Sequence, residues 1–68
     1  MKLTTQKQVR EAFWAAHPFL EHQARAAGIF SKRQNAHPAT TRCTFVDFVD
    51  ALHRDGVISD ALAGRVTL

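Results

Sequence analysis

The sequence has a single cysteine, Cys43, among its 68 residues, so no disulfide within the chain can stabilise it. A lone cysteine also fits a reducing compartment better than secretion. The other candidate metal ligands are four histidines, and none of them forms an HxxxH pattern or joins a CxxC pair. They are His17, His22, His37 and His53. We therefore expect no metal site and no cofactor, and the fold must be stabilised by packing.

Long apolar runs are also absent. No stretch approaches the roughly eighteen residues that a membrane-spanning helix requires. The first residues, 1–4, include a basic side chain but no apolar segment follows it, so they do not match a signal peptide. These absences predict a cytoplasmic protein.

The charge is modest in total but uneven along the chain. Nine Lys and Arg residues against six Asp and Glu give a net charge of +3. Residues 1–46 hold seven basic and two acidic residues, whereas residues 47–68 hold two basic and four acidic ones. A basic segment of this kind attracts nucleic acid or an acidic protein surface, although it also suits a protein that needs only to remain soluble.

Helical signals occupy the first part of the chain. Thr5 and Gln8 have the spacing of a capping box, and an apolar stripe at helical period follows from Val9. Pro18 interrupts this stripe, which leaves open whether the segment forms two helices or one kinked helix. Gly28 is expected to end the second helical stretch in a left-handed conformation.

The strongest helical period lies in the second half of the sequence. Thr40 or Thr41 is expected to cap this helix, and Gly56 is expected to end it. Ser59 has the position and chemistry to cap a short last helix. The apolar stripe consists of Phe45, Phe48, Val49 and Leu52, widened by Val46.

Together these signals predict an all-α fold, a compact three- to four-helix bundle with a C-terminal helix–Gly–helix hairpin, in one domain over residues 1–68. Eighteen Leu, Ile, Val, Phe and Trp side chains are available for the core, which makes stability marginal and would favour a dimer or a larger partner. The expected elements are helices at about 5–17, 18–27, 41–54 and 59–66, with a basic loop at 31–40.

The closing hairpin has the outline of a DNA-binding helix-turn-helix. Its second helix, however, would begin with Asp60 at the end that meets the bases, and it carries a single cation, Arg65. We therefore interpret the hairpin as a scaffold that completes the core.

Two other surfaces are candidates for binding. Trp14 is most simply a core residue, but an exposed ridge of the first helix would suit a protein interface, because a tryptophan beside cations is a common anchor. The residues of that ridge are Lys7, Arg10 and Trp14, with Glu11 beside them. The basic loop offers charges and hydrogen-bonding groups for nucleic acid, but no aromatic side chain for base stacking. Its residues are Lys32, Arg33, Gln34, Asn35, His37 and Arg42, with Arg54 as a further cation.

Enzyme chemistry is not expected. The carboxylates of Asp47 and Asp50 belong to a solvated helix face. No histidine lies at a spacing from Cys43 that would indicate a Cys/His nucleophile. A chain this short has little room for a desolvated pocket. A thiol- or metal-based activity at Cys43 remains only a distant third hypothesis.

The segment from Arg42 to Leu68, with Ala12-Phe13-Trp14 and His17-Pro18 upstream, resembles short open reading frames of bacteria and of their phages and plasmids. The resemblance implies a compact bacterial protein of mobile-element origin and carries no functional residue. Small proteins of that origin commonly regulate or interfere with host machinery by binding. The leading hypothesis is thus a non-enzymatic module that contacts a protein partner or itself, and the alternative is a small nucleic-acid-binding regulator.

Overall fold

The computed structural model describes residues 2–68, and the predictions that include Met1 extend one residue beyond them. The described residues form helices and no strand, which confirms the all-α prediction. The radius of gyration of 11.5 Å is close to the value of about 11 Å expected for a compact chain of this length. The elements are α1 (Gln6–Ala16), α2 (Pro18–Ala26), the 3₁₀ turn η1 (Gln34–Ala36), α3 (Ala39–Arg54) and α4 (Asp60–Ala63).

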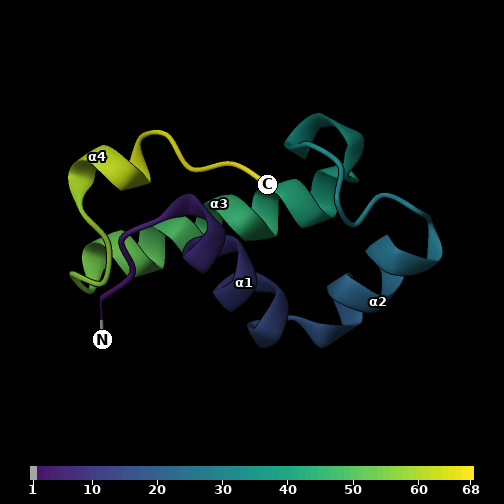
Figure 1. The fold of residues 1–68 in the computed structure, drawn as a ribbon, viewed down its shortest axis with the longest axis horizontal. Coiled ribbons are helices and arrows are strands. Elements are labelled where there is room, and N and C mark those ends of the chain that lie inside the picture. The colour runs from purple at the N-terminus through teal and green to yellow at the C-terminus, as the bar shows by residue number, and fades with distance from the viewer. Residues whose placement is uncertain (1) are drawn as a thin grey trace.

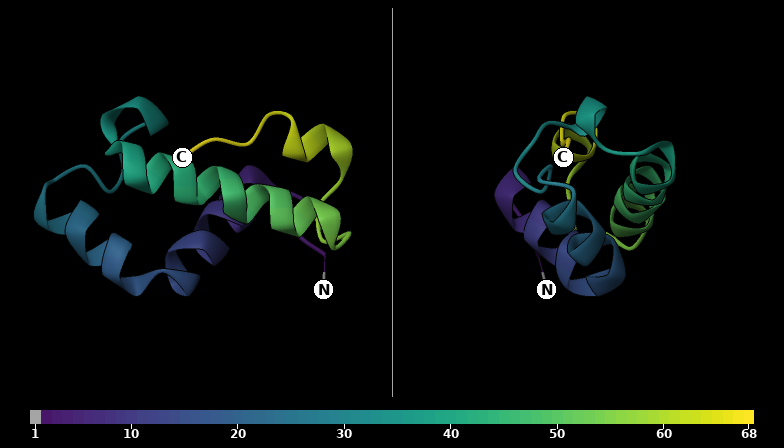
Figure 2. Two further views of the ribbon diagram at one scale, coloured as in Figure 1. Left: turned by 180° about the vertical axis from the view of Figure 1, so that it is seen from behind. Right: turned by 90° about the vertical axis from the view of Figure 1, so that its right-hand side faces the viewer.

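The helices lie in two groups. α1 and α2 follow one another along one side of the molecule, and α3 runs along the other side (Figure 1; Figure 2). α1 packs against both α2 and α3, and α4 packs against α3. After α4 the chain turns back along α3 and ends above the middle of that helix (Figure 1).

The start of α1 follows the predicted capping box. The hydroxyl of Thr5 accepts from the Gln8 amide at 3.1 Å, and the Gln8 side chain accepts from the Thr5 amide at 3.2 Å. α1 ends at His17, whose φ of −131° and ψ of 64° are not helical. Pro18 causes this break, because its ring disfavours the helical conformation of the preceding residue. The two stretches are therefore separate helices, which the sequence alone left open.

α2 and α3 end in the same way. Gly28 and Gly56 both have a φ of 74°, a left-handed conformation that favours glycine. After α3, the amide of Val57 donates to the carbonyl of Leu52 at 2.9 Å, and the corresponding bond closes α2. This is the Schellman pattern, and it confirms both predicted helix ends.

The start of α3 was predicted wrongly. The helix begins at Ala39, and neither Thr40 nor Thr41 caps it. Pro38 occupies the N-cap position without a side-chain hydrogen bond, and Thr41 is 4% exposed inside the helix. The helix starts directly after the proline, since proline disfavours helical geometry only in the residue before it. The predicted basic loop is correspondingly shorter, and it contains η1.

The last helix is shorter than predicted. Ser59 caps α4 as expected, accepting from the Leu62 amide at 3.2 Å, but the helix stops before Gly64 instead of reaching residue 66. Glycine is a poor helix former, so the chain leaves the helix there and turns back over the bundle. This return buries Val66 and Leu68 at 8% exposure each.

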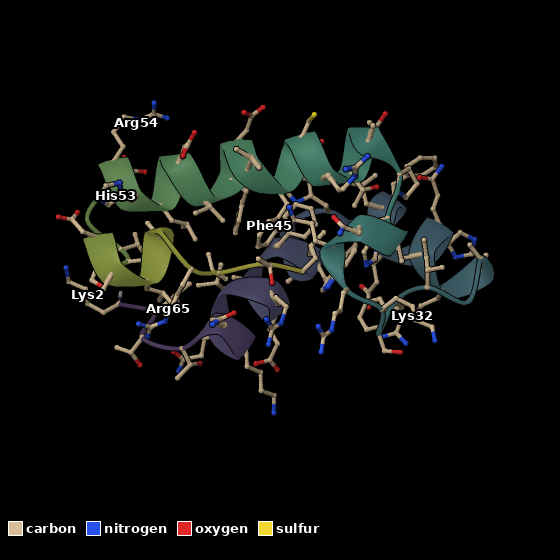
Figure 3. The ribbon with its side chains drawn as sticks, turned by 90° about the horizontal axis from the view of Figure 1, so that it is seen from above. Lys2, Lys32, Phe45, His53, Arg54 and Arg65 are labelled. Atoms are coloured by element: carbon tan, nitrogen blue, oxygen red, sulfur yellow. The ribbon has the colours of Figure 1, made fainter. Side chains whose placement is uncertain are left out.

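The core is centred on Phe13. Its ring meets those of Trp14, Phe45 and Phe48 edge-on at centroid distances of 5.0, 5.1 and 5.5 Å. Phe45 points from α3 into the interior (Figure 3). Val46, which was expected to widen the apolar stripe, is instead 49% exposed. The buried hydrophobic residues are Val9, Phe13, Trp14, Ala24, Phe45, Val49, Ile58, Leu62, Val66 and Leu68.

None of the helices in residues 2–68 has both the length and the apolar character that crossing a membrane would require.

Candidate functional site

A cavity of about 500 Å³ opens between α1, the segment that follows α2, and the C-terminal segment. We call it the basic hollow. Its rim is charged: Lys7, Arg10 and Glu11 come from α1, and Lys32 and Arg33 come from the segment before η1. The rim thus holds four of the nine Lys and Arg residues and one of the six acidic residues, a net charge of +3.

The cations of the rim are free to meet a ligand. The ion pairs among the described residues are Arg25–Glu21 and His53–Asp60, and neither involves the rim. Lys7, Lys32 and Arg33 are exposed. Cations of like sign that converge on one cavity raise the local concentration of anions.

Arg10 is the one rim cation that is fixed in place. Its Nη1 donates to the carbonyl of Thr67 at 2.9 Å and approaches Oε1 of Gln6 at 3.4 Å. The first bond joins residues 57 positions apart and brings the C-terminal segment against α1. A guanidinium carries five donors, so the remaining N–H groups can still bind a carboxylate.

The floor of the hollow is aromatic. Trp14 is 7% exposed, so its predicted place on an exposed ridge is wrong. The chain reverses direction at Gly28. As a result, the rings of Phe30 and His37 pack against Trp14, at centroid distances of 5.1 and 5.6 Å. The Arg25 guanidinium lies 3.9 Å from the centre of the Phe30 ring. Trp14 therefore forms part of the core beneath the rim, and little of its ring is exposed to a ligand.

The six residues of the predicted nucleic-acid set do not share one surface. Lys32 and Arg33 join the hollow, and Asn35 is exposed in η1. His37 was expected in the open loop but is 3% exposed, with its Nε2 3.1 Å from the carbonyl oxygen of Lys32. It is buried because its ring packs on Trp14.

The other two members of that set lie elsewhere. Gln34 and Arg42 line a second, smaller cavity of about 370 Å³ beside the start of α3. Cys43 lines the same cavity and is exposed. The two cavities share no lining residue, so the predicted loop set is divided between them.

Other cations lie on the same side of the molecule as the hollow. In Figure 3, Lys2, Arg65 and Lys32 lie on the side away from α3. Arg54 extends from α3 at the opposite edge (Figure 3), whereas His53 lies between α3 and α4, where its Nε2 meets the carboxylate of Asp60. Arg54, expected on the third helix as a further cation of the nucleic-acid-binding set, is therefore separated from the basic loop.

The C-terminal wall of the hollow escaped sequence reasoning. Thr67 and Leu68 line the cavity opposite α1, and Leu68 is 8% exposed. Nothing in the local sequence pattern places these residues beside Arg10 or Arg33. Only the fold brings them together.

Within residues 2–68, no three His, Cys, Asp or Glu side chains are grouped closely enough to hold a metal ion. Comparisons with protein-family models, with curated proteins and with solved structures find no match to the chain.

Proposed function

We propose that the protein is a non-enzymatic binding module that holds an acidic segment of a partner protein in the basic hollow. The observation that supports this proposal is the convergence of four cations from two distant parts of the chain on one cavity. It unites Lys7 and Arg10 of the predicted protein-binding ridge with Lys32 and Arg33 of the predicted loop. The buried ring of Trp14, on α1, packs against Phe30, which lies next to the Lys32–Arg33 segment.

The chemistry of the rim favours carboxylates. Arg10 is already oriented by Thr67, so it loses little freedom when it binds. Exposed ion pairs contribute only about 0.2–1 kcal/mol each, so several must act together. We therefore expect a partner with clustered acidic side chains, and binding that weakens as salt is added.

Nucleic acid is the second candidate. It is favoured by Lys2 and Arg65, which extend the cationic side beyond the hollow (Figure 3). It is disfavoured because Trp14 is too buried to stack on a base, and because Gln34 and Arg42 line a different cavity. An acidic protein segment needs none of these groups, so it ranks first.

The biological setting follows as part of the same proposal. The resemblance to short reading frames of mobile elements supports a bacterial regulator, or a protein that interferes with host machinery, acting by binding. The single cysteine supports a reducing compartment such as the cytoplasm.

The test is a titration with a glutamate-rich peptide, followed by the fluorescence of Trp14, the only tryptophan. The double variant Lys32→Gln/Arg33→Gln is expected to weaken binding about two- to thirtyfold, since each of the two lost pairs costs about 0.2–1 kcal/mol. Arg65→Gln removes a cation outside the hollow and is expected to bind as the unaltered protein does. Failure to bind the peptide at low salt, or undiminished binding by the double variant, overturns the proposal.

A parallel titration with a DNA duplex separates the two candidates. Sequence-independent phosphate binding depends on the number of cations that the phosphates neutralise. If the duplex binds and the peptide does not, with Arg65→Gln weakening binding as well as Lys32→Gln/Arg33→Gln, then nucleic acid replaces the acidic segment as the partner.

A further inference from the structure

We infer that the acidic partner of the basic hollow is a second copy of this chain, which presents the outer face of its α3. The inference rests on the proposed function, because it names the occupant of the same site. Its grounds are the charges on α3, their spacing, and the direction in which α3 faces.

The outer face of α3 carries two exposed carboxylates, Asp47 and Asp50, of which Asp47 lines the smaller cavity together with Arg42. Asp47, Asp50 and Arg54 follow one another at helical spacing, and all are exposed; with Val46 we call them the outer stripe. No ion pair of the described residues includes Asp47 or Asp50. The sequence favours an Asp50–Arg54 pair, but these two side chains form no ion pair within 4.0 Å. Both carboxylates are thus available to another molecule.

The charge pattern of the outer stripe complements that of the hollow. The two carboxylates and the guanidinium lie within eight residues of helix, from Asp47 to Arg54, about 10 Å along its axis. The hollow offers four cations and one carboxylate, Glu11. Asp47 and Asp50 can therefore pair with the cations, while Arg54 meets Glu11. Val46, 49% exposed, lies beside these charges and can cover the half-buried ring of Phe30.

The two surfaces face away from one another. Figure 3 shows Arg54 at the outer edge of α3 and Lys32 on the opposite side of the molecule. A chain therefore cannot fill its own hollow with its own stripe. In a two-fold dimer in which the two hollows face each other, two sites of net charge +3 would meet, and like-charge repulsion disfavours this arrangement. The contact is therefore head-to-tail, and it leaves one hollow and one stripe free for further copies.

The test measures self-association by sedimentation across a concentration series. The full chain is expected to form dimers and longer species at low salt. The association constant is expected to fall about tenfold or more at high salt, because the paired charges are exposed and screened. Two variants remove one surface each: Lys32→Gln/Arg33→Gln alters the hollow, and Asp47→Asn/Asp50→Asn alters the outer stripe.

Mixing the variants gives the most specific result. Each variant alone is expected to remain a monomer, and circular dichroism checks that each is folded. Their mixture is expected to form a one-to-one complex and nothing larger, since one partner supplies the intact stripe and the other the intact hollow. Asp55→Asn makes the same change of charge just beyond α3 and is expected to associate as the unaltered chain does.

Three outcomes overturn the inference: a strictly monomeric chain at low salt, undiminished association of Asp47→Asn/Asp50→Asn, or no complex in the mixture. If the glutamate-rich peptide nevertheless binds the hollow, the proposed function stands and only the identity of the partner is wrong. If the peptide does not bind, the proposed function fails as well.

Discussion

The α3–α4 hairpin and the basic hollow are held together by different kinds of contact. In the hairpin, Val57 donates to Leu52 and Leu62 donates to Ser59, so each bond joins residues a few positions apart. In the hollow, Arg10 donates to Thr67, and Trp14 lies against Phe30. The hairpin is therefore a local structure, whereas the hollow exists only when the whole chain has folded.

This difference separates stability from binding. The hairpin contributes buried side chains, and Leu62 is 1% exposed. The cations Lys7, Lys32 and Arg33 at the rim of the hollow are exposed. We expect substitutions of the buried and capping residues of the hairpin to change the free energy of unfolding, and substitutions of the exposed rim cations to change binding. The following predictions test that separation, from the largest expected change in stability to the smallest.

Leu62→Ala is expected to lower the free energy of unfolding by about 2–5 kcal/mol, because it leaves a cavity where α4 packs on the core. Urea unfolding followed by circular dichroism measures the loss. Val46→Ala is the control, and since Val46 is 49% exposed we expect a change within about 0.5 kcal/mol. Equal effects of the two substitutions would show that α4 does not complete the core.

Gly56→Ala is expected to cost about 1–2 kcal/mol, because its φ of 74° strains any residue with a Cβ atom. Gly64→Ala is the matched control in the same hairpin. Gly64 has a right-handed φ of −79°, and a Cβ atom there would lie 3.5 Å from its nearest neighbour, an ordinary contact. In thermal unfolding, Gly56→Ala should have a lower midpoint temperature than the unaltered protein, and Gly64→Ala should have an equal or higher one.

Ser59→Ala is expected to cost about 1 kcal/mol, since it removes the acceptor of the Leu62 amide at the start of α4. Hydrogen exchange of that amide should accelerate in the variant. Ser31→Ala lies at the hollow and removes no helix cap, so it should leave stability unchanged. A stability loss as large as that of Ser59→Ala would contradict the contrast between the two regions.

Lys32→Gln/Arg33→Gln is expected to change the free energy of unfolding by no more than about 0.5 kcal/mol, because both side chains are exposed. The same variant is expected to bind the peptide more weakly, as described above. Urea unfolding and the peptide titration, performed on one preparation, compare the two effects. A large loss of stability would mean that the rim is structural.

The sequence predicts the parts of the fold that depend on neighbouring residues. The Thr5 capping box, the left-handed Gly56 and the Ser59 cap each follow from residues within one or two turns of a helix. The predicted start of α3 was wrong because Thr41, a good capping residue, is buried inside the helix. The length of α4 was overestimated because its apolar spacing continues beyond Gly64, where the helix ends.

The candidate site was only half visible in the sequence. The cations Lys7, Arg10, Lys32 and Arg33 were all identified, but as two separate surfaces. Their meeting depends on the reversal of the chain after α2 and on the return of the C-terminal segment, and neither leaves a periodic signal. The same folding buries Trp14, which the sequence left either in the core or on the exposed ridge.

The most direct test of the central claim, that the hollow is the binding surface and the hairpin its scaffold, is an NMR titration with the glutamate-rich peptide. It is best performed on Asp47→Asn/Asp50→Asn, in which the proposed self-association is absent. We expect shifts at the amides of residues 7–14, 30–33 and 67–68 and at the Trp14 indole, and none between Gly56 and Ala63. Shifts centred on the hairpin, or none anywhere at low salt, would contradict the account.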